Sequence, residues 1–88
     1  MRYELIIKPT AERSLDRLSQ TIRRCIVDAL EELRSEPRPA GCLKMAGDEN
    51  AWRIRVGDYR IVYEIHDGRL LVLVVRVGHR KDVYRKGK

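Results

Sequence analysis

Apolar residues recur at helical spacing in two stretches of the first third of the chain. In the first stretch these residues are Ala11, Leu15 and Leu18. In the second stretch they are Ile22, Cys25, Ile26, Ala29, Leu30 and Leu33. The spacing predicts two amphipathic helices, one opening at Pro9 or Thr10 and the other capped by Thr21. Each helix has a single apolar side, so the pair needs a second layer to cover it.

Alternation of apolar and polar residues, broken by turn signals, predicts strands elsewhere in the chain. These strands span residues 2–8, 43–45, 52–56, 59–66 and 69–77. Pro9 ends the first strand, and a loop with two prolines at 35–41 leads from the helices to the second. The predicted order is β-α-α-β-β-β-β in a single domain of residues 1–88. It is an α+β fold in which a helical hairpin packs on one face of an antiparallel sheet.

The turn at Gly57-Asp58 predicts the register of the first hairpin. A two-residue turn places Arg55 opposite Arg60 and Arg53 opposite Val62. Because side chains alternate between faces, three arginines share one side of the sheet. We call this side, which carries Arg53, Arg55 and Arg60, the arginine face. The opposite side is predicted to pack against the helices, and it carries Trp52, Ile54, Val56, Tyr59, Ile61 and Tyr63.

A second turn signal, Asp67-Gly68, predicts another two-residue hairpin. In that register Leu73 lies beside Val62 and Val75 beside Arg60, with Val77 following on the same side. The arginine face would then have an apolar floor on which a base can lie. Glu64 falls on this face as well, where it can pair with a guanidinium or serve as a base, and we expect the ion pair. Gly78 is predicted to end the last strand.

The positive charge lies in the second half of the chain, and this narrows the choice of partner. Residues 1–50 carry nine Lys/Arg and nine Asp/Glu, whereas residues 51–88 carry ten basic and four acidic residues. The whole net charge of +6 therefore belongs to the second half, where seven of the ten basic residues are Arg. Segregated charge of this kind is typical of a protein that binds an anionic partner such as nucleic acid. A solubilising basic surface explains neither the segregation nor the preference for Arg.

Other features of the sequence restrict the class of protein. Cys25 lies on the apolar stripe of the second helix and is predicted to be a core residue, and Cys42 is predicted to be half-buried. Neither cysteine has a Cys or His neighbour at zinc-ligand spacing, and no P-loop or HExxH motif occurs, so we expect no metal and no cofactor. No apolar run is long enough to cross a membrane, and the first residues lack the apolar region of a signal peptide. These features predict a cytoplasmic protein without a membrane partner.

Three motifs give the chain a resemblance to a known family. They are Trp-Arg-Ile-Arg from residue 52, Gly-Asp-Tyr-Arg-Ile-Val-Tyr from residue 57, and Val-Gly-His-Arg-Lys-Asp-Val-Tyr-Arg from residue 77. Together with the strand–helix–helix start and the Pro-containing loop, they resemble the RelE/ParE toxin superfamily, and its RelE branch in particular, over nearly the whole chain. The resemblance implies a RelE-like fold, cleavage of mRNA in the ribosomal A site, and neutralisation by a cognate antitoxin protein.

The resemblance also implies a set of site residues. The residues predicted to be catalytic are Arg53, Arg55, Arg60, Arg80 and Tyr84. The residues predicted to bind RNA are Lys44, Arg53, Arg55, His79, Lys81 and Arg85. Well-characterised RelE toxins have lysines where this chain has Arg53 and Arg55. Arginine stays protonated and cannot act as a general base, so these side chains are suited to stabilising charge.

The reaction that fits these residues is metal-independent attack of a ribose 2′-OH on its own 3′ phosphate, which gives a 2′,3′-cyclic phosphate. Arg53, Arg55 and Arg60 are expected to stabilise the phosphate, Arg80 to approach the leaving oxygen, and Tyr84 to stack on a base or align the 2′-OH. His79 is a further candidate for proton transfer, with a simple surface position as the alternative. Two other functions stay open: a ParE-like inhibitor of DNA gyrase, and a non-catalytic nucleic-acid-binding relative.

Overall fold

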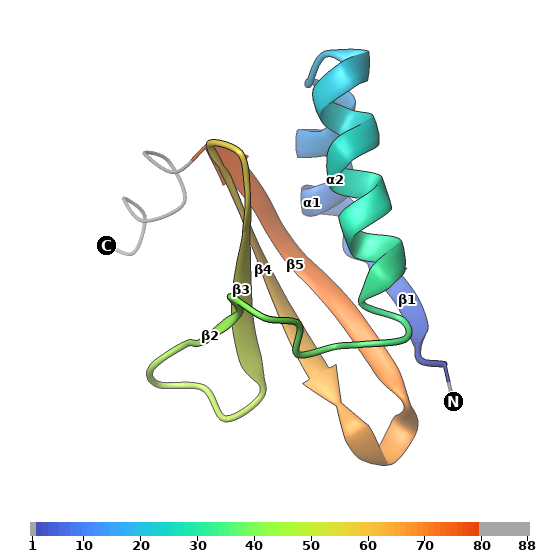
Figure 1. Ribbon diagram of the computed structural model, residues 1–88, viewed down its shortest axis with the longest axis vertical. Helices are drawn as coiled ribbons and strands as arrows, with labels where there is room; N and C mark the ends of the chain where they lie inside the picture. Colours follow the sequence, from blue (N-terminus) through green and yellow to red (C-terminus); the bar gives the residue numbers. More distant parts are fainter. Residues whose placement is uncertain (1, 80–88) are drawn as a thin grey trace.

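The computed structural model describes residues 2–79, which form two helices and a five-stranded sheet (Figure 1). The helices are α1 (Pro9–Asp16) and α2 (Gln20–Glu32). The strands are β1 (Glu4–Ile7), β2 (Leu43–Lys44), β3 (Ala51–Val56), β4 (Tyr59–His66) and β5 (Leu71–His79), with a short 3-10 turn at Asp67–Arg69. The predicted α+β class and element order are confirmed.

The strand order in the sheet is β1-β5-β4-β3-β2. The pairs β2–β3, β3–β4 and β4–β5 are antiparallel, as predicted. The first strand differs, because β1 pairs with β5 in parallel, with Glu4 beside Leu71 and Ile7 beside Val74. The sheet is therefore mixed. Since β1 joins the last strand of the chain, its direction depends on a contact that local sequence does not specify.

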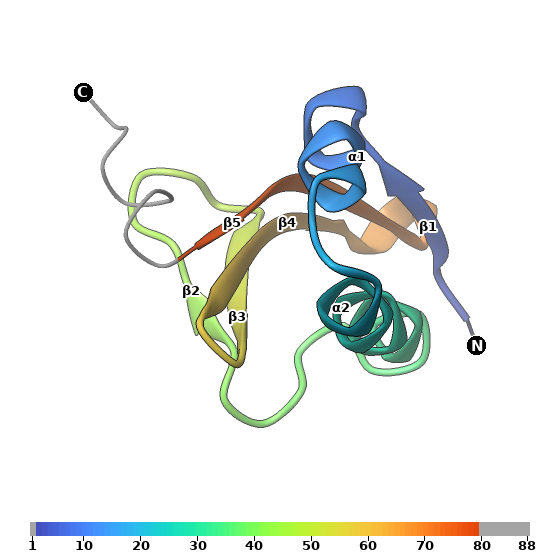
Figure 2. The same cartoon turned by 90° about the horizontal axis from the view of Figure 1, so that it is seen from above.

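Both helices cover the same face of the sheet (Figures 1 and 2), and the core lies between the two layers. From the helices the core contains Ala11, Leu15, Ile26, Leu30 and Leu33, and from the sheet it contains Ile54, Ile61, Tyr63, Ile65, Val72, Val74 and Val77. Trp52, Val56 and Tyr59 pack against this core, as predicted for that face. Cys25 was expected in the core but is exposed, since only a narrow stripe of α2 reaches the sheet. Cys42 is half-buried, as predicted.

Two features of the helix starts follow from capping chemistry. The first helix begins at Pro9, where the missing N–H costs nothing because it has no intrahelical partner. The second begins earlier than predicted, because Ser19 is its cap and Thr21 lies inside the helix. The Ser19 hydroxyl accepts a hydrogen bond of 3.3 Å from the backbone N–H of Ile22. A serine therefore satisfies one of the first free N–H groups of α2.

The first hairpin has the predicted register, with Arg55 opposite Arg60 and Arg53 opposite Val62. The second does not. Its turn contains the 3-10 segment and Leu70, whose φ of 50° is left-handed, so His66 lies opposite Leu71. The prediction of a two-residue Asp67-Gly68 turn was therefore wrong. The predicted end of the last strand at Gly78 was wrong as well, because β5 continues to His79.

A β-bulge between β4 and β5 then changes which side chains face outward. Tyr63 lies opposite Val74, but its neighbour Val62 lies opposite Arg76, so Val75 is the extra residue. Beyond the bulge every side chain of β5 changes face relative to the predicted pairing. Val77, expected on the arginine face, is 3% exposed and belongs to the core. The predicted apolar floor is correspondingly smaller, because Val75 is not paired with Arg60 and Leu73 lies opposite Glu64.

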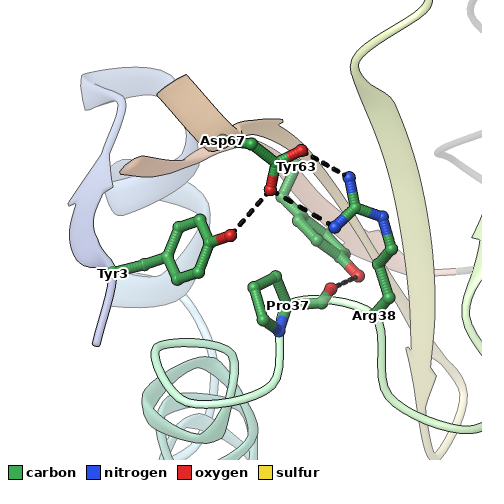
Figure 3. Close-up of polar contacts among 5 residues, drawn as sticks. All are labelled: Tyr3, Pro37, Arg38, Tyr63 and Asp67. Atoms are coloured by element: carbon green, nitrogen blue, oxygen red, sulfur yellow. Dashed lines mark hydrogen bonds and ion pairs between the residues drawn. The ribbon is translucent and has the colours of Figure 1, made fainter. Parts of the chain in front are cut away.

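The segment between α2 and β2, residues 33–42, passes over the sheet on the side of the helices (Figure 1) and is held there by polar contacts (Figure 3). We call it the crossing loop. The buried Tyr63 hydroxyl donates a 2.7 Å hydrogen bond to the carbonyl oxygen of Pro37. The Arg38 guanidinium contacts both carboxylate oxygens of Asp67, at 2.8 and 3.4 Å, and the Tyr3 hydroxyl donates to the same carboxylate at 2.6 Å. These contacts join the residue before β1, the crossing loop and the β4–β5 turn.

The Arg38 hydrogen bond, followed by that of Tyr3, holds the pKa of Asp67 below its ordinary value of about 4. A carboxyl with a lowered pKa stabilises the fold above its unfolded pKa, and this stabilisation disappears as the pH falls through the folded one. We expect Asp67→Asn to lower the urea midpoint at neutral pH and to have a smaller effect at about pH 3. A difference between the two proteins that is independent of pH would contradict this assignment.

Candidate functional site

The arginine face combines residues from two adjacent strands. Arg53 and Arg55 lie on β3 and Arg60 on β4, and the register places all three on the side of the sheet away from the helices. Neighbouring strands are about 4.8 Å apart, so the directly opposed pair Arg55 and Arg60 brings two guanidiniums within reach of one phosphate. The structure therefore brings together the three arginines that the first hairpin predicted.

Arg60 has the most demanding environment of the three. Its side chain is half-buried, and one terminal nitrogen, Nη1, is inaccessible to solvent without a hydrogen-bond acceptor among residues 2–79. An unsatisfied buried donor on a cation is costly, and so is the like-charged partner Arg55 across the strand. On its other side Arg60 faces Gly78, which contributes no side chain. An anionic oxygen beside Arg60 would relieve both costs.

A groove of about 630 Å³ connects these arginines with apolar surface. It lies between the second half of α2, the crossing loop and β3, and Arg53, Arg55 and Arg60 all contribute to its lining. The groove forms because β2 pairs with only Trp52 and Arg53, which leaves the rest of this edge of β3 unpaired within the described chain. Glu32 is the carboxylate of the lining, against three guanidiniums. Cationic and apolar groups side by side suit a ligand with phosphate and base components.

Several other predicted site residues lie apart from this face or have other partners. Lys44 pairs with Trp52, so it lies on the opposite side of the sheet, where its Nζ donates to the Asp48 carbonyl at 2.8 Å and lies 5.8 Å from the Trp52 ring centroid. His79 pairs with Tyr59, again on the helix side, and the two rings meet edge to face at 5.5 Å. The register therefore separates Lys44 and His79 from the arginine face.

Glu64 was expected to pair with an arginine, and this was wrong. Its carboxylate instead contacts Nε2 of His66 at 2.9 Å. Residues that share a face on one strand are about 6.6 Å apart, so Glu64, four residues from Arg60, lies about 13 Å along the strand. The predicted residues Arg80, Lys81, Tyr84 and Arg85 lie outside the described residues.

Arg76 joins the arginine face and was missed by sequence reasoning. It lies opposite Val62, which on its other side faces Arg53, so the two arginines flank one apolar residue. A signal was available, because the predicted two-residue turn would have placed the charged Arg76 on the helix-packed face beside Tyr59. A charged residue at a core position indicates a bulge that shifts the alternation.

Among residues 2–79 no three His, Cys, Asp or Glu side chains form a group that could hold a metal ion. In the same residues, neither helix has the length and apolar character needed to cross a membrane. The guanidiniums of Arg53, Arg55 and Arg60 give the groove positive charge and hydrogen-bond donors.

Comparison with known proteins supports the assignment of the fold and the family. Residues 5–84 match the family described as ParE toxin of type II toxin–antitoxin system. Toxin RelG of Mycobacterium tuberculosis is 33% identical over 87 residues, covering 98% of this chain and 100% of that protein. The mRNA interferase toxin RelE of Escherichia coli (strain K12) is 31% identical over 87 residues, covering 96% and 92%.

Solved structures agree with these relatives. The isolated E. coli RelE toxin matches with a TM-score of 0.78 at 29% identity, over 93% of this chain and 90% of that one. The toxin–antitoxin complex RelBE of E. coli matches with a TM-score of 0.77 at 29% identity, over 88% and 95%. Sequence motifs, fold and relatives agree, and the chain belongs to the RelE/ParE superfamily of type II toxin–antitoxin toxins.

Proposed function

We propose that this toxin is a ribosome-dependent endoribonuclease that cleaves mRNA. The observation that carries the proposal is the convergence of Arg53, Arg55 and Arg60 on one groove, with an unsatisfied buried donor on Arg60. Such a site is suited to a phosphodiester that gains negative charge during reaction. The relatives named mRNA interferase support the choice of mRNA as the substrate.

The proposed reaction uses a nucleophile that belongs to the RNA. The 2′ oxygen attacks the adjacent phosphorus, the bond from phosphorus to the 5′ oxygen of the next nucleotide breaks, and the products carry a 2′,3′-cyclic phosphate and a 5′-OH. One proton leaves the 2′ oxygen and another is added to the leaving oxygen. Arg55 and Arg60 stabilise the negative charge of the phosphorane. Arg53, which lies on β3 with Arg55, binds a phosphate oxygen.

Proton transfer requires groups other than these arginines, which stay protonated. The Glu64–His66 pair is about 13 Å from Arg60 along β4, too far to act on the same phosphate. Arg80 is proposed to approach the leaving oxygen, and Tyr84 to stack on a base or align the 2′-OH. Both roles come from the family resemblance. The basic residues Lys81 and Arg85 are proposed to bind RNA in the same segment.

An antitoxin protein is the proposed regulatory partner. Related toxins are known in RelBE complexes, and a chain whose positive charge is concentrated on one half is suited to an acidic partner. We propose that the cognate antitoxin covers the arginine face or displaces the C-terminal segment. Ribosomes carrying mRNA are the other partner, which places the toxin's action in the cytoplasm.

The products formed with ribosomes test this function. We expect the protein to cut a message only when it is bound to ribosomes, and to leave a 2′,3′-cyclic phosphate and a 5′-OH. End-labelling of the fragments, with and without prior phosphatase treatment, identifies these termini. A 3′-OH and a 5′-phosphate would contradict the proposed chemistry.

Two alternative functions are distinguished by a gyrase supercoiling assay and by RNA binding, measured beside the cleavage experiment. The matching family is described by its ParE members, so gyrase inhibition is the second candidate. If the protein inhibits supercoiling by DNA gyrase and does not cleave RNA, it is a ParE-like toxin. Salt-dependent binding of RNA with no cyclic-phosphate product would identify a non-catalytic relative.

A further inference from the structure

A second cleft lies on the β5 side of the sheet, away from the groove beside β3. It occupies about 450 Å³ between α1 and β5. Its polar lining consists of Lys8, Thr10, Ser14 and Arg76, and its apolar lining comes from Val75 and Val77. Within residues 2–79 no carboxylate contributes to the lining, in contrast to the groove beside β3, which includes Glu32.

The position of the cleft follows from the end of β1. That strand pairs with β5 only as far as Ile7 beside Val74, and the Lys8 N–H then donates to the Val74 carbonyl at 2.9 Å before the chain turns into α1. Beyond Val74, β5 has no strand neighbour on this side within residues 2–79. The side chain of Lys8 is therefore held at the edge of β5 where the bulge places Arg76.

Arg76 connects this cleft with the arginine face, because it lines the cleft and also lies opposite Val62. Arg53 and Arg76 are two strands apart, a distance of about 10 Å across the sheet. Both side chains are long enough to turn toward one extended strand that crosses Val62. Lys8 and Arg76 form no ion pair with another residue in the described part of the chain, so their charges are available.

We propose that the Lys8–Arg76 cleft binds a backbone phosphate of the message, next to the phosphate held by the arginine face. The inference rests on the proposed function and extends it, since it gives the direction in which the RNA leaves the site: from β3 across Val62 to β5 and α1. Two cations and the Thr10 hydroxyl, without an acidic residue among the described lining, match a phosphodiester, while the Ser14 hydroxyl already donates to the Thr10 carbonyl at 3.2 Å. Among residues 2–79 the lining of the cleft includes no aromatic ring for stacking, so we expect these residues to contact the RNA backbone without base specificity.

The test measures binding to ribosomes that carry a message with a 2′-deoxy sugar at the cleavage position, which prevents the reaction. We expect the double variant Lys8→Gln, Arg76→Gln to bind these programmed ribosomes about tenfold more weakly. The slope of log affinity against log salt concentration should fall by about 1.4, because each lost contact with a single strand accounts for about 0.7.

The double variant Arg24→Gln, Arg69→Gln is the matched control, because it removes two positive charges from exposed positions, on α2 and in the β4–β5 turn, that line neither cavity. If the Lys8 and Arg76 double variant binds as tightly as this control, with an unchanged salt slope, the inference is wrong. An equal loss of binding to ribosomes without a message would assign the cleft to ribosomal RNA and overturn the message path. A loss confined to binding of an acidic antitoxin would assign the cleft to that protein partner.

Failure of the proposed function has a separate signature. In that case the wild-type protein leaves the normal message intact on ribosomes, whatever the Lys8 and Arg76 variants do. The uncleavable message still reports binding, so the two inferences are judged by different measurements.

Discussion

Replacing Arg60 with glutamine should reduce the single-turnover rate of mRNA cleavage on ribosomes by about 10²–10³-fold, the usual effect of removing one preorganised donor to a developing negative charge. Arg60 is the arginine whose Nη1 is buried without an acceptor in the described residues, and it lies directly opposite Arg55. Glutamine retains a hydrogen-bond donor but removes the charge. The loss should therefore appear in the cleavage rate at saturating protein more than in ribosome binding.

The fold should survive this change, and it should even become slightly more stable. The substitution removes a like-charge contact across β3 and β4 together with a buried unsatisfied donor. Thermal unfolding of Arg60→Gln should match or exceed that of the wild type. Arg69→Gln is the matched control, since it removes the same charge from an exposed position in the β4–β5 turn. Full cleavage by the Arg60 variant, or an equal loss in the control, would refute the role given to Arg60.

Replacing Ile26 with alanine should lower the free energy of unfolding by about 2–5 kcal/mol, the range for truncating a fully buried aliphatic side chain. Ile26 has no solvent exposure and belongs to the core between α2 and the sheet. A small domain has about 5–15 kcal/mol of total stability, so this single change can remove much of it. Urea unfolding monitored by circular dichroism measures the difference.

The next residue supplies the control for this prediction. Val27 is 39% exposed, on the solvent side of the same helical turn. Val27→Ala should change stability by no more than about 0.5 kcal/mol, because the lost contacts are few and alanine is the better helix former. Equal destabilisation by the two changes would mean that α2 packs on a different face from the one described.

Local patterns determined much of this protein. The spacing of apolar residues located both helices, and the Gly57-Asp58 turn gave the register of β3 and β4, including the opposition of Arg55 and Arg60. These predictions succeeded because each depends on residues close together in the chain. The arginine face follows from alternation along two strands joined by the shortest possible hairpin.

Two predictions within single elements were wrong, one because of local backbone conformation and the other because of packing. The Asp67-Gly68 turn was expected to be a two-residue hairpin, but Leu70 adopts a left-handed conformation that a β-hairpin signal does not anticipate. Cys25 fits the helical stripe, yet the width of the buried stripe is set by the sheet that packs on it. Periodicity gives the direction of a helix face, and packing decides how much of that face is covered.

Longer-range features were decided only by the tertiary structure. Pairing of β1 with β5 joins the two ends of the described chain, and the hydrogen bonds of Arg38 and Tyr3 with Asp67 connect segments 29 and 64 residues apart. The bulge at Val75 is of the same kind: it moves Val77 into the core and Arg76 onto the arginine face. Each of these outcomes depends on the free energy of contacts between distant segments, whereas the sequence pattern reports only the preferences of neighbouring residues.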